Sequence, residues 1–255
     1  MSEAFRGSTQ KELLSAGKSM FSKYSALFVG QGGAWKLIRY ELVNLFFSWI
    51  PGALGLWARK TFYPPLFRRV GRGAVFGRNV TFRHPHKISL GANCFIDDNV
   101  VLDAKGEANT GLELGDNVYV GRNTILSCKE GDIVIGEHSN ISANCSLLSE
   151  TEIRLGKYCF LAGHCYLVAG GNHSFDDLTT PIMFQPSFSR GGIRVADDVW
   201  LAAGVIVLDG VTIERGCVVG AGAVVTESLP EYSVAVGSPA RRIRDRRERR
   251  PGREV

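Results

Sequence analysis

Several features that would place the chain in a common class are missing. Its six cysteines show no CxxC or other clustered spacing, so the sequence indicates neither a disulfide framework nor a zinc site and favours a reducing compartment. The first residues lack the basic-then-apolar order of a secretory signal. No apolar run reaches the roughly 20 residues that cross a bilayer. We therefore expect a cytoplasmic protein, or one held at the inner face of the membrane.

Residues 241–255 form a strongly basic segment, with eight arginines against three acidic residues in a chain whose net charge is +5. The distal part of this tail is expected to be a solvated end. The tail is short and carries no interleaved aromatic residues, so we do not expect it to bind nucleic acid. Arg241 and Arg244 directly follow a Gly-Ser-Pro-Ala turn, and they are placed to meet a phosphorylated ligand.

The dominant pattern is a six-residue repeat that runs from Val70 to Val225. Every counted position is apolar, and the positions group in threes. Most are preceded, two residues earlier, by a second small apolar residue such as Cys94 or Cys217. The counted residues are Val70, Phe76, Phe82, Leu90, Ile96, Leu102, Leu114, Val120, Leu126, Ile135, Ile141, Leu147, Leu155, Leu161, Leu167, Val195, Leu201, Val207, Ile213, Val219 and Val225. Three six-residue strands make a triangular coil, so the repeat predicts an all-β fold, a parallel β-helix of about seven stacked coils.

Extra residues interrupt the repeat at one corner of the coil only, and the longest insertion is a loop at 169–192. The stacked core does not depend on such a loop, and a long loop on a rigid scaffold often carries function. We therefore predict a helical extension or cap over residues 1–66, a β-helix domain with its corner loop over 67–228, and a C-terminal segment with the basic tail over 229–255.

The region before the repeat holds two aromatic-rich stretches. Residues 34–50 are compatible with a helix that ends before Pro51, and residues 56–70 lead into the first coil. We expect them to cap the open end of the β-helix, whose terminal strands would otherwise present unpaired edges. An alternative is a helix lying in a membrane surface, because aromatic side chains mingle with lysine and arginine. The two roles are compatible.

The last part of the chain, residues 197–244, resembles the C-terminal segment of hexapeptide-repeat acetyltransferases of the galactoside, maltose and xenobiotic type. Together with the repeats, the resemblance covers about residues 70–244. The preceding extension is closer to that of acetyltransferases acting on surface polysaccharide or lipopolysaccharide sugars. The resemblance implies a left-handed parallel β-helix, which departs from the usual right-handed crossover, and a homotrimer that binds acetyl-CoA between neighbouring subunits.

The resemblance carries the family's CoA contacts over to six positions without a gap. Small side chains suit the slim pantetheine arm, exposed backbone amides suit its carbonyls, and arginines suit its phosphates. The implied residues are Trp200, Ala203, Ala221, Thr226, Arg241 and Arg244. The family has a serine at the position of Ala203, so a hydroxyl contact is lost here. Without the resemblance, the alanines would be read as corner packing and Trp200 as an exposed aromatic at a subunit contact.

His173, in the loop sequence AGGNHSFDD, resembles the catalytic histidine of the family. An imidazole can take the proton of an attacking hydroxyl and pass it to the leaving thiolate, while an N–H near Ala203 stabilises the oxyanion. We expect direct attack rather than an acyl-enzyme. The family often has proline after this histidine, whereas Ser174 follows here, so the loop geometry differs. Asp176 or Asp177 could orient the ring, or could simply be solvated.

The stretch ISANCSL resembles the family segment whose last asparagine holds the acceptor sugar, which implies that role for Asn144. Asparagine is also common at corners because it accepts left-handed backbone angles. His164 lies one coil later at the matching corner position, and we expect it to face the same cleft.

An enzyme of the γ-carbonic anhydrase kind would share the scaffold but needs three histidines around one zinc. His138 and His164 fall in different thirds of their coils and no HxxxxH spacing occurs, so we expect no metal. A non-catalytic scaffold is a further alternative. The sequence favours an acetyl-CoA-dependent O-acetyltransferase acting on a hydroxyl of a sugar or glycan precursor, with N-acetylation of an amino sugar as the runner-up.

Overall fold

The computed structural model describes residues 17, 19–30 and 33–248. Residues 1–16 of the expected extension and residues 249–255 of the basic tail lie outside the described residues. Among the described residues, three helices precede the β-helix, and none of them has the length and apolar character needed to cross a membrane. The helices are α2 (Met20–Phe28), α3 (Ala34–Phe47) and α4 (Gly52–Phe62), followed by the 3-10 turn η2 (Pro64–Leu66).

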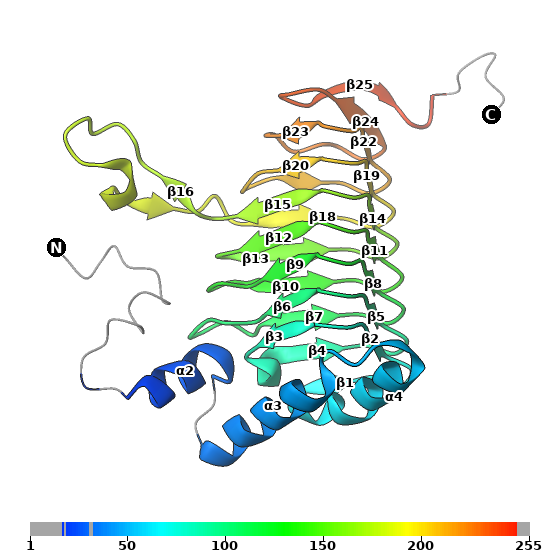
Figure 1. Ribbon diagram of the computed structural model, residues 1–255. Coiled ribbons are helices and arrows are strands. Elements are labelled where there is room, and N and C mark those ends of the chain that lie inside the picture. Colours follow the sequence, from blue (N-terminus) through cyan, green and yellow to red (C-terminus); the bar gives the residue numbers. More distant parts are fainter. Residues whose placement is uncertain (1–16, 18, 31–32, 249–255) are drawn as a thin grey trace.

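The strands form a parallel left-handed β-helix with three faces, which confirms the predicted fold (Figure 1). Sheet A contains β1 (Arg69–Val70), β4 (Ile88–Leu90), β7 (Leu112–Leu114), β10 (Asp132–Ile135), β13 (Glu152–Leu155), β18 (Ile193–Val195) and β21 (Thr212–Ile213). Sheet B contains β2 (Val75–Phe76), β5 (Phe95–Ile96), β8 (Tyr119–Val120), β11 (Asn140–Ile141), β14 (Phe160–Leu161), β19 (Trp200–Leu201), β22 (Val218–Val219), β24 (Ser233–Val236) and β25 (Arg241–Asp245). Sheet C contains β3 (Thr81–Arg83), β6 (Val101–Asp103), β9 (Ile125–Ser127), β12 (Ser146–Ser149), β15 (Tyr166–Ala169), β20 (Ile206–Val207) and β23 (Val224–Val225). Each coil therefore runs A, B, C, and its corners are called A–B, B–C and C–A.

The core is the inward column that the repeat predicted. Twenty of the twenty-one counted residues are at most 3% exposed, and Val70 is half-buried because it lies in the first coil, at the end of the stack. The six cysteines are buried free thiols. Burial raises the pKa of the Cys128 thiol to about 12, so this side chain packs as a small neutral group.

The B–C corners carry a ladder of asparagine side chains. Asn79, Asn99, Asn123 and Asn144 all have φ between 55° and 60°, a conformation that asparagine accepts more readily than most residues. Each side-chain amide donates to the next asparagine in the column, over 3.3, 3.2 and 3.1 Å. His164, at φ 64°, follows Asn144 in the column. The ladder therefore links the first four coils along one edge.

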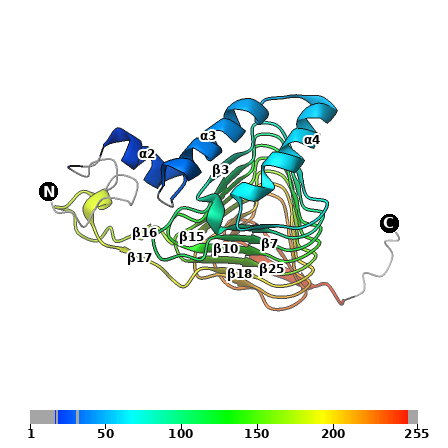
Figure 2. The ribbon, with the colours of Figure 1, turned by 90° about the horizontal axis from the view of Figure 1, so that it is seen from below.

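The helices cover the N-terminal end of the stack, where α3 and α4 lie across the first coil (Figure 2). The buried guanidinium of Arg59 donates to the carbonyls of Phe47, Ile50 and Phe76 at 2.8–3.1 Å. The buried Tyr40 hydroxyl donates to the carbonyl of Phe82 at 2.8 Å. The carbonyls of Phe76 and Phe82 belong to the first coil, and the end of a β-helix would otherwise leave such groups unpaired.

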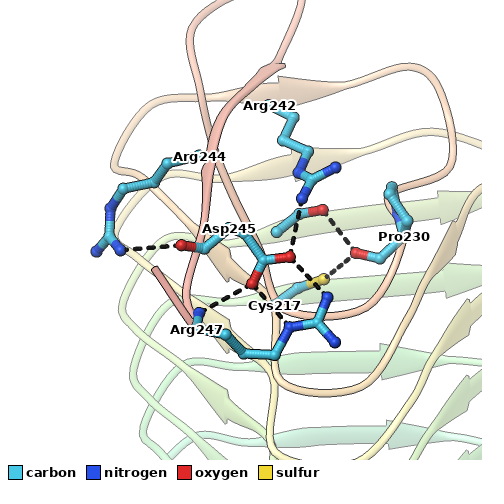
Figure 3. Close-up of polar contacts among 7 residues, drawn as sticks. Cys217, Pro230, Arg242, Arg244, Asp245 and Arg247 are labelled. Carbon is cyan, nitrogen blue, oxygen red and sulfur yellow. Dashed lines mark hydrogen bonds and ion pairs between the residues drawn. The ribbon is translucent and has the colours of Figure 1, made fainter. Parts of the chain in front are cut away.

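At the other end, β24 and β25 continue sheet B beyond residue 228. β24 pairs in parallel with β22, and β25 pairs antiparallel with β24. Asp245 receives hydrogen bonds from the guanidinium groups of Arg247 and Arg242 (Figure 3). The bonds from Arg247, together with the charges of both arginines, lower the pKa of the Asp245 carboxyl. The first part of the basic segment is therefore a paired edge strand.

Candidate functional site

The corner loop leaves the β-helix after β15 and projects from the C–A corner (Figure 1). Two short antiparallel strands form its stem, β16 (Asn172–His173) and β17 (Ser187–Phe188), and His173 pairs with Ser187. The backbone N–H of Ser174 donates to the carbonyl of Pro186 at 2.9 Å. The predicted base, His173, is exposed on this stem.

Asp209, in the next C–A corner, holds the stem in place. Its carboxylate accepts hydrogen bonds from the Asn172 side chain (2.8 Å), the Ser189 hydroxyl (3.1 Å) and the amides of Arg190 and Gly192 (2.5 and 2.8 Å). Burial opposes ionisation, yet the bonds from Arg190, Gly192 and Ser189 lower the pKa of Asp209 below its ordinary value. A carboxylate therefore fixes both ends of the loop, one residue from His173. The sequence analysis did not predict a role for Asp209. The pattern that could have indicated it is the Asp-Gly pair at 209–210, in the corner that follows the long loop.

The tip of the loop is tied by its own side chains. Asp177 accepts hydrogen bonds from the amide and hydroxyl of Thr179 at 2.8 and 2.7 Å, and bonds from Thr180 and Thr179 lower the pKa of the Asp177 carboxyl. Gln185 is buried and donates to the carbonyls of Asp177 and Thr180. Asp177 thus stabilises the turn of the loop. The structure gives it no contact with His173.

Four predicted residues lie on the B–C edge of successive coils. Asn144, His164, Ala203 and Ala221 are all exposed there. The carbonyl of Ala203 accepts from the amide of Gly222 at 2.9 Å. Within residues 33–248, no hydrogen bond engages the N–H of Ala203 or Ala221. This edge therefore presents two small side chains with unused backbone donors.

Trp200 and Arg244 lie on sheet B itself rather than on the B–C edge. Trp200 pairs with Val218, Val218 with Val234, and Val234 with Arg244, so the four residues form one register column. Trp200 is 46% exposed and its ring stacks on Phe160, with centroids 6.4 Å apart. An apolar ring and a guanidinium thus stand at the two ends of one column.

The arginines of β25 differ in their partners. Arg244 donates only to the backbone carbonyl of Asp245, at 3.3 Å, and turns away from the Asp245 carboxylate (Figure 3). Its Nε is buried without a hydrogen-bond partner, and among the described residues it takes part in no ion pair. Arg241 lies 3.5 Å from the exposed carboxylate of Glu227. Both cations remain accessible to an anionic ligand.

The predicted site residues do not gather in one chain. Thr226 directly follows β23 on sheet C. His173 lies beyond the C–A corner, so the width of sheet C separates it from the B–C edge of its own chain. Any cleft that contains both His173 and the B–C edge therefore needs surfaces from more than one copy.

The histidines lie at different places on the β-helix. His138 is at an A–B corner, stacked on Tyr158 at 5.1 Å, whereas His164 is at a B–C corner. Among the described residues, no three His, Cys, Asp or Glu side chains are grouped as metal ligands would be.

Comparison with known proteins agrees with the repeat. Residues 192–227 match the family model described as bacterial transferase hexapeptide (six repeats). The chain is 33% identical over 163 residues to a Mycobacterium tuberculosis protein named probable acetyltransferase Rv3034c, covering 64% of this chain and 53% of that one. It is 42% identical over 105 residues to a Schizosaccharomyces pombe protein that is also named as an acetyltransferase, covering 40% and 47%. The chain spans about half the length of these relatives.

Among solved structures, a variant of AntD resembles this fold. AntD is an N-acyltransferase from Bacillus cereus, determined with dTDP-4-amino-4,6-dideoxyglucose and coenzyme A. The likeness has a TM-score of 0.50 at 23% identity and covers 71% of this chain and 85% of that one, which supports the fold alone. The repeat, the β-helix and the sequence relatives together confirm the resemblance found in the sequence: the chain is a hexapeptide-repeat protein similar to acetyltransferases.

Proposed function

We propose that the chain is an acetyl-CoA-dependent O-acetyltransferase that acts on a hydroxyl of a sugar or glycan precursor. The observation that carries the proposal is the arrangement near the C-terminal end of the β-helix. There an exposed ring, two accessible guanidinium groups and two corner amides that make no hydrogen bond within residues 33–248 lie on one face and its edge. An extended ligand with an apolar arm and phosphates needs these groups in this order.

The donor would lie along this face and edge. Arg241 and Arg244 would hold the phosphates, since neither is neutralised by a close buried carboxylate. The amide of Ala221 would bind a pantetheine carbonyl, and the small methyl groups of Ala203 and Ala221 leave room for the arm. Trp200 would contribute an apolar wall, and Thr226, which lies across sheet C from this edge, would contribute a hydroxyl from a neighbouring copy. Backbone donors can replace the hydroxyl contact that Ala203 lacks.

His173 would act as the general base. Its imidazole would take the proton from the acceptor hydroxyl as the oxygen attacks the thioester carbonyl. The N–H of Ala203 would stabilise the negative charge that develops on the carbonyl oxygen. Collapse of the tetrahedral intermediate breaks the carbon–sulfur bond, and the imidazolium returns the proton to the CoA thiolate. The acceptor would be held from the B–C edge by Asn144, with His164 beside it.

The active unit would be a homotrimer, because His173 and the B–C edge are separated in one chain. The outer surfaces support this assembly. Sheet B exposes rings at Phe95, Phe160 and Trp200, and sheet C exposes Ile125 and Tyr166. Sheet A instead carries charged groups; Glu152 pairs with Arg154 at 2.6 Å and with Arg194 at 3.1 Å. Sheets B and C therefore suit burial between copies, and sheet A suits solvent.

The test is release of CoA from acetyl-CoA with a panel of sugars, each offered as the hydroxyl compound and as its amino counterpart. Turnover with hydroxyl acceptors supports the proposal, whereas turnover with the amino sugars alone would favour the N-acetyltransferase. Absence of transfer to every acceptor, together with absence of CoA binding, would support a non-catalytic scaffold and overturn the proposal.

A further inference from the structure

The N-terminal helices carry a second apolar surface on the side turned away from the coils, and among the described residues nothing covers it. In α3, the residues that pack on the β-helix include Leu37, Tyr40 and Val43. The opposite stripe is exposed although it is also apolar. It comprises Trp35, Ile38, Leu42, Leu45 and Phe46, and it continues to Trp49 just after the helix. These positions recur three or four residues apart, which places them along one face of the helix.

The next helix enlarges this surface. Leu54 and Trp57 of α4 are 66% and 61% exposed, and the rings of Phe47 and Phe62 stack at 4.3 Å where α3 and α4 meet. Trp35 and Trp49 are 75% and 61% exposed. Three of the four tryptophans in the chain therefore project from one end of the molecule. We call Trp35, Trp49, Trp57 and the exposed leucines of α3 and α4 the aromatic end face.

The charge of the chain changes sign where the coils begin. Residues 17–78 contain ten lysines and arginines and a single acidic residue, Glu41. Residues 79–240 contain ten basic and nineteen acidic residues. Arg39 and Lys60 are exposed on the same helices as the tryptophans. The end that carries the rings is thus strongly cationic, and the body above it is anionic.

We propose that the aromatic end face docks on an anionic lipid bilayer, with α3 and α4 lying in the plane of the interface. Tryptophan favours the boundary between headgroups and acyl chains, and lysine and arginine are drawn to anionic headgroups. The anionic bilayer would repel the anionic body of the molecule. This repulsion would orient the β-helix axis perpendicular to the membrane. A trimer whose three-fold axis is parallel to the β-helix axis would present three such faces in one plane. Membrane binding would then be strengthened by multivalency.

The experiment is sedimentation of the full-length chain with vesicles of neutral phosphatidylcholine and with vesicles that also contain phosphatidylglycerol. We expect binding to the anionic vesicles to exceed binding to the neutral ones by about tenfold or more, and to fall with salt. Trp35→Ser, Trp49→Ser and Trp57→Ser combined should reduce binding at least tenfold. Arg39→Gln with Lys60→Gln should weaken binding mainly to the anionic vesicles. The matched control for the charge change is Arg154→Gln with Arg194→Gln, which removes two cations from the solvent-facing sheet A and should leave vesicle binding unchanged.

A second measurement needs no variant. Brominated lipids should quench the fluorescence of the native chain, and the quenching should be lost in the triple tryptophan variant. Lack of sedimentation and of quenching with anionic vesicles would overturn the proposal. So would a change of oligomeric state in the triple variant without lipid, since the face would then be a contact between copies. CoA release is measured separately, so failure here leaves the proposed activity intact.

Discussion

Trp200 and Arg244 occupy the same register column of sheet B, with Val218 and Val234 between them. Three strand spacings of about 4.8 Å separate them, or roughly 14 Å. The antiparallel return of β25 places a guanidinium in line with an aromatic ring that lies 44 residues earlier in the chain. A ligand that meets both must therefore run across the strands, along the axis of the β-helix.

Replacing both arginines tests the phosphate end of this column. Arg241→Gln/Arg244→Gln should raise the Kd for CoA about tenfold or more, because charge-assisted hydrogen bonds are lost. It should also flatten the dependence of binding on salt. Titration calorimetry at two ionic strengths measures both effects. Arg194→Gln, on sheet A, is the matched control and should bind CoA normally; an unaltered Kd in the double variant would remove the arginines from the site.

The role of the loop histidine is tested by turnover. His173→Ala should lower kcat about a hundredfold or more and leave CoA affinity nearly unchanged, because general-base catalysis contributes mainly to the chemical step. His164→Ala is the comparison, since it removes an imidazole from the B–C edge, and we expect it to raise the acceptor KM more than it lowers kcat. Equal kcat for His173→Ala and the native enzyme would reject the base assignment.

Two roles can be separated at Asn144, because its side chain is both a ladder member and a proposed acceptor contact. Asn144→Gly keeps the φ of 60° without strain. It should raise the acceptor KM about tenfold while changing the melting temperature little. Asn99→Gly makes the same change two coils lower in the same column. It should affect stability to the same extent and leave KM alone. If the two variants have the same KM, Asn144 serves only the corner.

Asp209 should control the order of the loop. Asp209→Asn replaces one of the two accepting oxygens by a donor, so bonds to Asn172, Ser189, Arg190 and Gly192 cannot all persist. Limited proteolysis within residues 170–192 should become about tenfold faster, because the stem opens locally. Turnover should fall with it. Cleavage at the native rate would show that the antiparallel stem alone holds the loop.

The same anchor predicts a pH dependence. Hydrogen bonding lowers the pKa of Asp209 from its ordinary value of 3.8, so the folded state holds this proton more weakly than the unfolded chain does. The stabilisation is complete above that ordinary pKa and disappears as the pH falls through the lower folded value. Proteolysis of the native loop should therefore accelerate only under acidic conditions, and in Asp209→Asn this step should be absent.

Arg59 should be essential for the fit between helices and coils. Arg59→Leu leaves one buried and two partly buried carbonyls without their donor, which should cost about 3 kcal/mol or more. Lys60→Leu changes the neighbouring exposed side chain and should cost less than about 0.5 kcal/mol. Denaturant unfolding measures both. A small effect for Arg59→Leu would mean that water satisfies those carbonyls.

The β-helix could be predicted in detail because burial of one residue in six is a local, periodic requirement. Phe82, Leu126 and Val219 are each fully buried as counted. Where the six-residue repeat is interrupted, the sequence no longer predicts the local structure. The sequence located the loop but not its stem, because Asn172–His173 pairs with Ser187–Phe188 through two-residue strands too short to leave a pattern.

Two features were not predicted from the sequence: the role of Asp209 in holding the loop, and the difference in charge between the helical end and the coils. Asp209 lies 36 residues after His173, and only the stacking of C–A corners brings it to the stem. The net charge of the chain does not reveal the cationic end, because the charges of residues 17–78 and residues 79–240 cancel. The exposure of Trp35 and Trp57 also required the structure, since the helix pattern alone does not say which of two apolar stripes meets the coils.

The loop departs from the fifth coil, and the helices cover the first. Four coil spacings of about 4.8 Å hold His173 roughly 19 Å beyond the base of the stack. Because the β-helix is rigid, it fixes the distance between His173 and the helices at the base. If the helices lie on a bilayer, the sugar ring that is acetylated must be well separated from the lipid headgroups. The outer units of a lipid-linked oligosaccharide meet this condition, whereas a sugar joined directly to its lipid does not.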